Sequence, residues 1–395
     1  MMMNTELKSQ INKELNSLYP LLKRFREDLH QHPELSWQEY RTTKKIEEFL
    51  KKNGLTNFKK PIDTGGYIDF VYKSKFPFIL LRADIDALPI QDKKKKPYAS
   101  KNKGVCHSCG HDMHTTIILG LAILIQKARL EFPFNLRFVF QPAEETIPNG
   151  ATPMIKAGVL KKVKYAFGLH MEPRLDVKTV SLTAGWINMQ SVRLNIIISG
   201  KSGHSAYPSK CNDPIWIASR IIQDSYQIIY REIDILKSPT ILSFTEIQAG
   251  EGYNIIPARL SMSGTFRTAD MEAKKLFFNK FSVLTKSIEG ETGAKIDVEC
   301  IEGAPPVLNN PELTQKLQEN TKKFDKTTKI VTELRSPGGD DFGLYSQKIP
   351  SVLFRFGTAK NGVAPRLHTD TFDVPPEVIK TSILFLMNQL LFLEV

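Results

Sequence analysis

The chain has 395 residues, of which 41% are hydrophobic and 24% are charged, and its formal net charge at pH 7 is +12. This balance is ordinary for a globular protein and excludes wholesale disorder. A chain of this length exceeds what one hydrophobic core usually supports, so we expect two domains.

The positive charge comes from scattered lysines and the short run Lys93 to Lys96, without a basic stripe interleaved with aromatic residues. We therefore expect a solvated lysine-rich surface and no nucleic-acid partner. The amino-terminal residues lack the apolar segment of a secretory signal, and the longest apolar runs fall short of the roughly 20 residues that a membrane span needs. Four cysteines are too few for a disulfide framework. These features predict a cytoplasmic protein without a membrane partner.

The first part of the chain predicts alternating helices and strands. Apolar residues at helical spacing between Leu18 and Leu29 indicate an amino-terminal helix, and a second helix is expected from about Ser36 to Lys52. Buried strands are expected in PFILLRADID and NLRFVFQPAEE, with the helix TTIILGLAILIQKA between them. This alternation predicts an α/β domain with a mixed, largely parallel sheet.

The pattern changes near residue 185. From there the chain predicts strand, helix, strand, strand, helix and strand, an order typical of a small two-layer domain. We therefore expect an inserted domain at residues 185–301, within a larger domain formed by residues 1–184 and 302–395. In the larger domain ligands should bind where parallel strands end, and two apolar strands there end in acids, at Asp84/Asp86 and Glu144/Glu145.

The stretch GVCHSCGHDMH, residues 104–114, places Cys106 and Cys109 in C-x-x-C spacing among three histidines. A zinc ribbon would need a second cysteine pair, but Cys211 and Cys300 are isolated. Metal ligation by part of the stretch, a thioredoxin-like dithiol and a cysteine nucleophile all remain open on these residues alone.

The stretch FQPAEETIPNG favours metal ligation. Adjacent side chains on an extended backbone point apart, so one glutamate can bind a metal while its neighbour acts as a general base. His170 in AFGLHMEP and His368 in APRLHTDTFD add two imidazoles. Five side chains then suffice for two divalent ions, namely Cys109, His111, Glu145, His170 and His368.

Eight short motifs of the chain resemble those of a known family. RADIDALP, CGHDMHT, QPAEE, GLHMEP, GHSAYP, NIIPA, GDDFG and LHTDTFD occur in the order seen in M20 metallopeptidases. The motifs are most similar to the amidohydrolase branch, which includes hippurate hydrolases, N-acyl-amino-acid deacetylases and auxin-conjugate hydrolases. The resemblance covers nearly the whole chain. It implies a two-metal hydrolase whose catalytic domain is interrupted by a lid or dimerisation domain.

Carried over motif by motif, the resemblance assigns the same five side chains as metal ligands and Glu144 as the general base and acid. It places Cys109 at the bridging position between the two ions. Asp84 matches an acid that orients the metal site from behind, whereas His204 and Asn254, in the inserted domain, match residues that approach the substrate. We interpret the remaining histidines as structural or supporting groups.

The resemblance implies a metal-dependent amidohydrolase that cleaves N-acyl (acetyl- or benzoyl-type) amino acids into a carboxylate and a free amino acid. The cofactors would be two divalent ions, Mn, Zn, Co or Ni, and the inserted domain could mediate a homodimer. The alternatives are a non-catalytic metal-binding or scaffold protein on a degenerate hydrolase fold and a C-x-x-C dithiol redox protein. Where relatives usually carry an apolar residue this chain has Cys106, and we hypothesise that it can trap Cys109 as a disulfide under oxidation.

Overall fold

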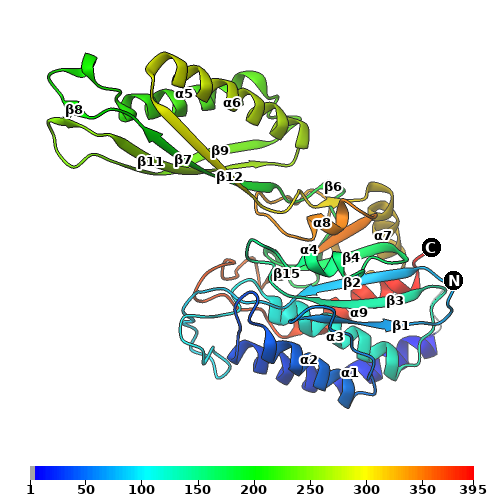
Figure 1. The fold of residues 1–395 in the computed structure, drawn as a ribbon. Coiled ribbons are helices and arrows are strands. Elements are labelled where there is room, and N and C mark those ends of the chain that lie inside the picture. Colours follow the sequence, from blue (N-terminus) through cyan, green and yellow to red (C-terminus); the bar gives the residue numbers. More distant parts are fainter. Residues whose placement is uncertain (1–4) are drawn as a thin grey trace. The chain divides into compact units, whose positions relative to one another are not determined.

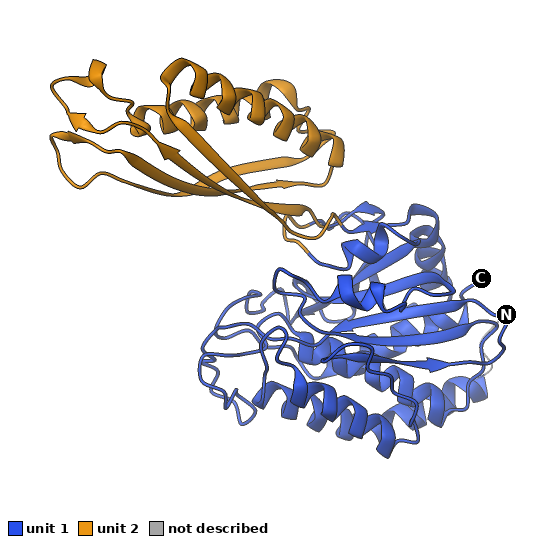
Figure 2. Cartoon of the chain, viewed as in Figure 1, with its two compact units in different colours: residues 1–187, 307–335, 340–395 blue, residues 188–306, 336–339 orange. Residues whose placement is uncertain are grey.

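The computed structural model describes residues 5–395, which form two compact units (Figures 1 and 2). Unit 1 comprises the described residues up to 187 together with residues 307–335 and 340–395. Unit 2 comprises residues 188–306 and 336–339. The roles that the sequence suggests for the two parts, catalysis and a lid or dimerisation surface, stay predictions.

Unit 1 is built around a seven-stranded sheet with the order β1-β3-β2-β4-β15-β5-β14. The neighbours β3, β2, β4 and β15 run parallel, whereas β1 is antiparallel to β3 and β5 is antiparallel to β15. The predicted α/β fold with a mixed, largely parallel sheet is thereby confirmed. The strands are β1 (Gly66–Phe70), β2 (Phe78–Asp84), β3 (Asn135–Gln141), β4 (Val163–Asp176), β5 (Thr179–Ser181), β14 (Lys329–Val331) and β15 (Ser351–Ala359).

Helices cover both faces of this sheet, which explains why every residue of β2 and β3 is buried. Ile79 and Leu81 of β2 pack with apolar residues of α1, α3 and α9, whereas Leu80 points the other way and packs with residues of α4 and α8. The helices of unit 1 are α1 (Thr5–Gln31), α2 (Tyr40–Lys52), α3 (His111–Lys127), α4 (Ala151–Lys156), α7 (Pro311–Phe324), α8 (Gly343–Ser346) and α9 (Glu377–Leu391). A two-stranded pairing joins β6 (Gly185–Trp186) to β13 (Leu308–Asn309).

The second helix begins later than the sequence predicts, at Tyr40 and not at Ser36. The segment before it is held in another conformation, because Leu35 bridges to Ala87 and Trp37 has a φ of +68°. The Ser36 hydroxyl donates a hydrogen bond to Asp86, 2.7 Å away. Tertiary contacts at the end of β2 therefore override the local helix preference.

Unit 2 contains a four-stranded antiparallel sheet with the order β12-β7-β11-β9 and two helices. Its larger elements follow one another as strand, helix, strand, strand, helix and strand, and a separate apolar core joins them. They are β7 (Gln190–Ser199), α5 (Pro214–Glu232), β9 (Thr240–Ala249), β11 (Arg259–Thr268), α6 (Met271–Thr292) and β12 (Lys295–Glu302). The short elements are β8 (Gly203–His204), the 3-10 turn Pro208–Lys210 and β10 (Ile255–Ile256).

Candidate metal centre

The stretch that follows the C-x-x-C spacing turns sharply into α3. Gly110 precedes the helix with a φ of +93°, and a Cβ at this position would lie 2.9 Å from Cγ of Met171. Glycine is the residue that tolerates both the positive φ and the close approach. The turn buries Cys109 and His111 side by side at the start of α3.

His111 presents one ring nitrogen to the centre. Its Nδ1 lies 3.0 Å from the backbone oxygen of Asp86 and 3.1 Å from the Asp86 carboxylate, so Nδ1–H donates to acceptors on the side away from the centre. Its Nε2 is buried, without a hydrogen-bond partner, and lies 3.8 Å from Oε1 of Glu145. Burial opposes protonation, but Asp84 and Cys109 raise the pKa of His111 well above its ordinary value, so a metal that binds at Nε2 would displace a proton.

Glu145 lies between two imidazoles. Its Oε1 is buried and forms an ion pair with Nε2 of His368 at 3.3 Å. His368 itself has a φ of +58°, a costly backbone conformation for this residue, and its backbone N–H donates to the Ser108 carbonyl at 2.8 Å. This bond fixes the carboxyl-terminal loop against the residue that precedes Cys109.

His170 approaches from β4. Its Nδ1–H donates to the Met171 carbonyl at 2.7 Å, and its Nε2 lies 3.5 Å from Sγ of Cys109. Burial lowers the pKa of His170 well below its usual value, which favours the neutral form that binds metals. Burial and the nearby Glu145 raise the pKa of the Cys109 thiol, so a thiolate there would require a compensating cation.

The five predicted ligands therefore come together from four separate parts of the chain. Among residues 5–395, donor atoms of Cys109, Glu145 and His368 lie within 4.8 Å of one another, and so do those of His111, Glu144 and Glu145. The two groups share Glu145, and His170 joins through its contact with Cys109. A thiol, imidazoles and carboxylates whose donor atoms converge in this way fit the requirements of divalent transition-metal ions.

Glu144 faces a different set of neighbours from Glu145. Its carboxylate lies with Asp340 and Asp341 in a third cluster of potential ligand atoms, and the Asp341 backbone N–H points at its Oε1 from 3.4 Å. Burial and the charges of Glu145, Asp340 and Asp341 raise the pKa of Glu144 well above its ordinary value. A carboxyl group with a raised pKa can both accept and return a proton near neutral pH.

Two acids that the sequence analysis did not assign hold this arrangement in place. The Asp86 carboxylate accepts bonds from the His111 ring, the Ser36 hydroxyl and, at 3.0 Å, the Glu145 backbone N–H. The fully buried Glu39 accepts the backbone N–H of Ala143 at 2.8 Å, where the chain has a φ of +50° immediately before Glu144. Burial and the charge of Asp86 raise the pKa of Glu39 to about 7.

Asp84 lies behind the centre, in contact with other polar groups. Its carboxylate accepts the Nδ1–H of His114 at 2.5 Å and an Arg82 N–H at 2.7 Å, and it lies 3.7 Å from Nε2 of His111. The other nitrogen of His114 accepts the Met171 backbone N–H at 3.0 Å, which links α3 to β4 beside His170. Burial opposes ionisation, but His111, His114 and Arg82 hold the pKa of Asp84 well below its usual range.

The two predicted substrate residues belong to unit 2 and lie near each other there. His204 is exposed on β8, which pairs with β10, and the N–H of the following Ser205 donates to the Asn254 carbonyl at 3.0 Å. Their approach to a substrate stays a prediction. The four cysteines are all free, and Cys106 is fully buried, so a disulfide between Cys106 and Cys109 also stays a hypothesis.

Residues 80–390 match the family model described as peptidase family M20/M25/M40. The chain belongs to this family. Among its M20 relatives, the N-acetylcysteine deacetylase of Bacillus subtilis is 38% identical over 334 residues, which cover 84% of this chain and 87% of the deacetylase. The thermostable carboxypeptidase 1 of Saccharolobus solfataricus is 34% identical, with 95% of this chain and 96% of that protein covered.

Two solved structures share the fold. A Bacillus subtilis protein described as a dinuclear metal-binding peptidase from the M20 family superposes with a TM-score of 0.82 at 33% identity, and the match covers 96% of this chain and all of the other. A structure from methicillin-resistant Staphylococcus aureus superposes with a TM-score of 0.90 at 26% identity, with 98% of this chain and 100% of the other covered. In the part of the chain that the structure describes, no helix is long and apolar enough to cross a membrane.

Proposed function

We propose that this M20 protein is a metal-dependent amidohydrolase that cleaves the amide bond of N-acyl amino acids, releasing a carboxylate and a free amino acid. The observation that carries the proposal is the convergence of nitrogen, oxygen and sulfur ligand atoms around Glu145 and Cys109, beside a glutamate with a raised pKa. The similarity to an N-acetylcysteine deacetylase supports a small N-acyl substrate. The similarity to a dinuclear metal-binding peptidase supports two ions.

Cys109, His111, Glu145, His170 and His368 would hold the two ions. When bound, divalent ions there would polarise the scissile carbonyl and lower the pKa of the attacking water. Mn, Zn, Co and Ni are all compatible with a set of thiolate, imidazole and carboxylate ligands. Asp86 would keep His111 in the tautomer that binds a metal, because its carboxylate lies against the ring nitrogen that carries the proton.

Glu144 would move the proton. It is partly buried among Glu145, Asp340 and Asp341, all of which favour its protonated form. We assign it to take a proton from the attacking water and then return it to the leaving amine. Because one group performs both transfers, its proton affinity must lie near the operating pH, and burial next to three other acids shifts it in that direction.

The other classes have less support. A dithiol redox protein needs a reactive thiolate, but burial raises the pKa of both Cys106 and Cys109. A degenerate scaffold would be expected to have lost a ligand or the base, and the chain retains all of them. A carboxypeptidase, as in one relative, would use the same chemistry on a peptide bond, so the two activities differ in the acyl group that is removed.

The decisive experiment follows amino acid release from N-acetyl, N-benzoyl and N-peptidyl amino acids by the Glu144→Gln variant. We expect chelator-stripped wild-type protein to be inactive and to recover with at least one of the four metals. Glu144→Gln should keep its metal content but lose about 10²–10⁴-fold in turnover, the range attributed to a positioned general base.

An exposed acid provides the matched control. Glu131→Gln makes the same chemical change at a position that belongs to none of the four groups of potential ligand atoms and should leave turnover unchanged. Substantial residual turnover in Glu144→Gln would exclude this base assignment. Activity that survives metal removal, or disulfide reduction without added metal, would overturn the proposed reaction.

A further inference from the structure

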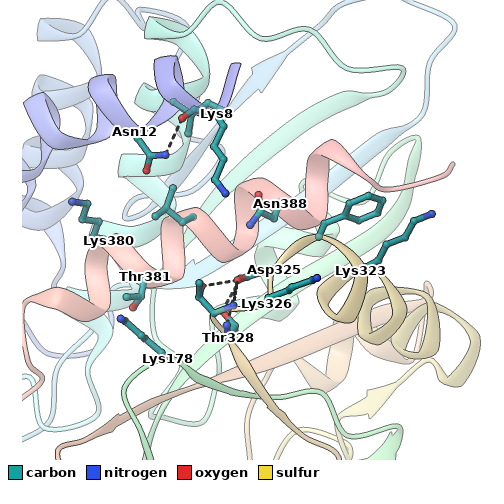
Figure 3. Close-up of a pocket in the computed structure, with 14 residues that line it drawn as sticks. Lys8, Asn12, Lys178, Lys323, Asp325, Lys326, Thr328, Lys380, Thr381 and Asn388 are labelled. Atoms are coloured by element: carbon teal, nitrogen blue, oxygen red, sulfur yellow. Dashed lines mark hydrogen bonds between the residues drawn. The ribbon is translucent and has the colours of Figure 1, made fainter. Parts of the chain in front are cut away.

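A cavity of about 600 Å³ lies in unit 1 and shares no lining residue with the candidate metal centre (Figure 3). Its wall is formed by α1, α9, the end of α7 with the loop that follows, and the turn between β4 and β5. The volume falls within the range of small-molecule sites. A second, much smaller hollow shares Lys178, Thr328 and Thr381 with it and reaches toward β15.

The cavity wall is strongly cationic. Five lysines line it, distributed over all of its walls (Figure 3), namely Lys8, Lys178, Lys323, Lys326 and Lys380. Asp325 supplies the single carboxylate among the lining residues. That carboxylate is occupied by hydrogen bonds within its own loop, because it accepts the backbone N–H and hydroxyl groups of both Thr327 and Thr328 at 2.6–3.2 Å.

Lysines of unit 1 occur both with and without an ion pair, and the cavity lysines belong to the second group. Lys93, Lys94 and Lys360 each form an ion pair with an aspartate or glutamate at 2.7–3.0 Å. Within residues 5–395, none of the five cavity lysines has such a pair, and the Lys380 ammonium donates to the neutral side chain of Asn16. The five ammonium groups of the cavity therefore outnumber its single carboxylate, which leaves the lining with a net positive charge.

The frame of the cavity is fixed by contacts beneath it. Phe324 stacks on Phe392 with ring centroids 3.5 Å apart, which holds the end of α7 on α9. The N–H of Lys329 donates to the Lys178 carbonyl at 2.9 Å, and Lys178 itself has a φ of +68°. A lysine in this conformation is strained where glycine would not be.

The cavity also has an apolar part. Ile11, Phe324 and Leu384 contribute to its lining, and most of the exposed lining surface is apolar. A bare inorganic anion would leave this surface in contact with water, whereas an anion attached to an apolar body would cover it. The combination of charge and apolar surface thus restricts the ligand to one chemical class.

We propose that this cavity binds a small organic anion, in which a phosphate ester or a dicarboxylate is attached to an apolar or aromatic body. The ammonium groups would contact the anion through charge-assisted hydrogen bonds, and the body would lie on Phe324 and Leu384. This site is separate from the centre that would hydrolyse the amide, so its ligand is not the substrate of the proposed reaction.

The test is calorimetric titration of the metal-loaded protein with 1-naphthyl phosphate, naphthalene-1,4-dicarboxylate, inorganic phosphate and 1-naphthol. Saturable binding of at least one of the two naphthyl anions is expected, weakening as salt is added, whereas phosphate and naphthol each bind at least about tenfold more weakly. Which naphthyl anion binds more tightly decides between the two kinds of anion. Lysine acylation followed by mass spectrometry should show ligand protection of Lys178 and Lys380.

Two charge-reversal variants locate the site. The double variant Lys178→Glu and Lys380→Glu should weaken binding at least about tenfold. The control Lys52→Glu and Lys75→Glu changes the net charge equally at exposed lysines outside the cavity and should leave binding unchanged.

Absence of saturable binding by both anions, equal binding of naphthol, or an equal loss in the control would overturn the proposal. If the first variant fails to fold, the protection pattern of the wild-type protein decides alone, and protection elsewhere refutes the assignment.

Discussion

The candidate metal centre and the lysine-lined cavity hold their charged groups in opposite ways. At the centre two of the imidazoles have a second protein partner behind them, Asp86 for His111 and the Met171 carbonyl for His170. Among the residues that the structure describes, the cavity lysines form no ion pair with a carboxylate, although Asp325 lies in the same lining. The centre is thus organised before any ligand arrives, whereas the lysines would have to be ordered by the ligand.

This difference predicts where substitutions should act. Removing a supporting group at the centre should disturb a ligand it never touches, because the geometry is carried by contacts between protein groups. Removing one lysine of the cavity should weaken only the binding of the anion. Three substitutions test how the protein supports the centre, and the charge-reversal variants test how the cavity lysines bind an anion.

The largest effect is expected from Asp86→Asn. The substitution removes the negative charge beside the His111 Nδ1–H and so makes the ring a weaker ligand, while the backbone carbonyl of residue 86 still accepts that N–H. Metal affinity, measured by competition with a chromophoric chelator, should fall about 10–100-fold. Ser36→Ala is the matched control, because it removes one donor to Asp86 without changing the acceptor for His111. Equal affinity in Asp86→Asn and wild-type protein would contradict the supporting role of Asp86.

A smaller, pH-dependent effect is expected from Glu39→Gln. Because burial and Asp86 raise the pKa of Glu39 to about 7 from an ordinary 4.5, the native state prefers the protonated acid. Ionisation therefore costs the wild-type protein stability progressively as pH rises from about 4.5 to 7, by an amount on the order of 2 kcal/mol. The neutral glutamine does not ionise.

Thermal unfolding measured at pH 5 and pH 8 tests this prediction. The melting temperature of Glu39→Gln relative to wild type should be higher at pH 8 than at pH 5. A difference that stays the same at both pH values would show that Glu39 does not titrate in this range. Because the amide oxygen can still accept the Ala143 N–H, the variant also separates the charge of Glu39 from its hydrogen bond.

The smallest effect concerns the turn before α3. Gly110→Ala forces a side chain into a φ of +93° and against Met171, and should lower the free energy of unfolding by about 1–2 kcal/mol. Gly104→Ala tests backbone strain alone, because its φ is +76° but a Cβ would meet no atom within 4 Å. The free energy of unfolding, measured by chemical denaturation, should therefore be lower for Gly110→Ala than for Gly104→Ala. Equal stabilities would mean that Met171 moves aside freely.

Much of this arrangement could be predicted from the sequence, because the strongest signals are local. The apolar run in β2, the periodicity of α1 and the change of pattern near residue 185 each depend on neighbouring residues. The ligand set could be predicted for the same reason. Cys109 and His111 lie close together in one short motif, and Glu144 and Glu145 in another. Their convergence confirms that these motifs lie close in space, while their metal and catalytic roles remain for experiment.

The supporting groups could not be predicted in the same way. Glu39 accepts a hydrogen bond from Ala143, which is 104 residues away in the sequence. Asp341 lies beside Glu144, which is 197 residues away. Neither contact leaves a local pattern, because each acid is assigned its role only by the tertiary fold. The predicted start of α2 was wrong for the same reason, because Ser36 is held by a hydrogen bond to Asp86. The cationic cavity likewise collects lysines from α1, α7, α9 and a turn, which scattered positive charge does not reveal.

The sheet order has a consequence for biosynthesis. β4 pairs with β2 on one side and with β15 on the other, and β15 follows β4 only after the whole of unit 2 has been synthesised. Until then a nascent chain would present β4 as an open edge, a template for pairing with other chains. The same late segment carries His368, whose backbone N–H closes onto Ser108. The ligand set and the protection of the sheet edge are therefore completed by one segment, so a prematurely terminated chain would lack both.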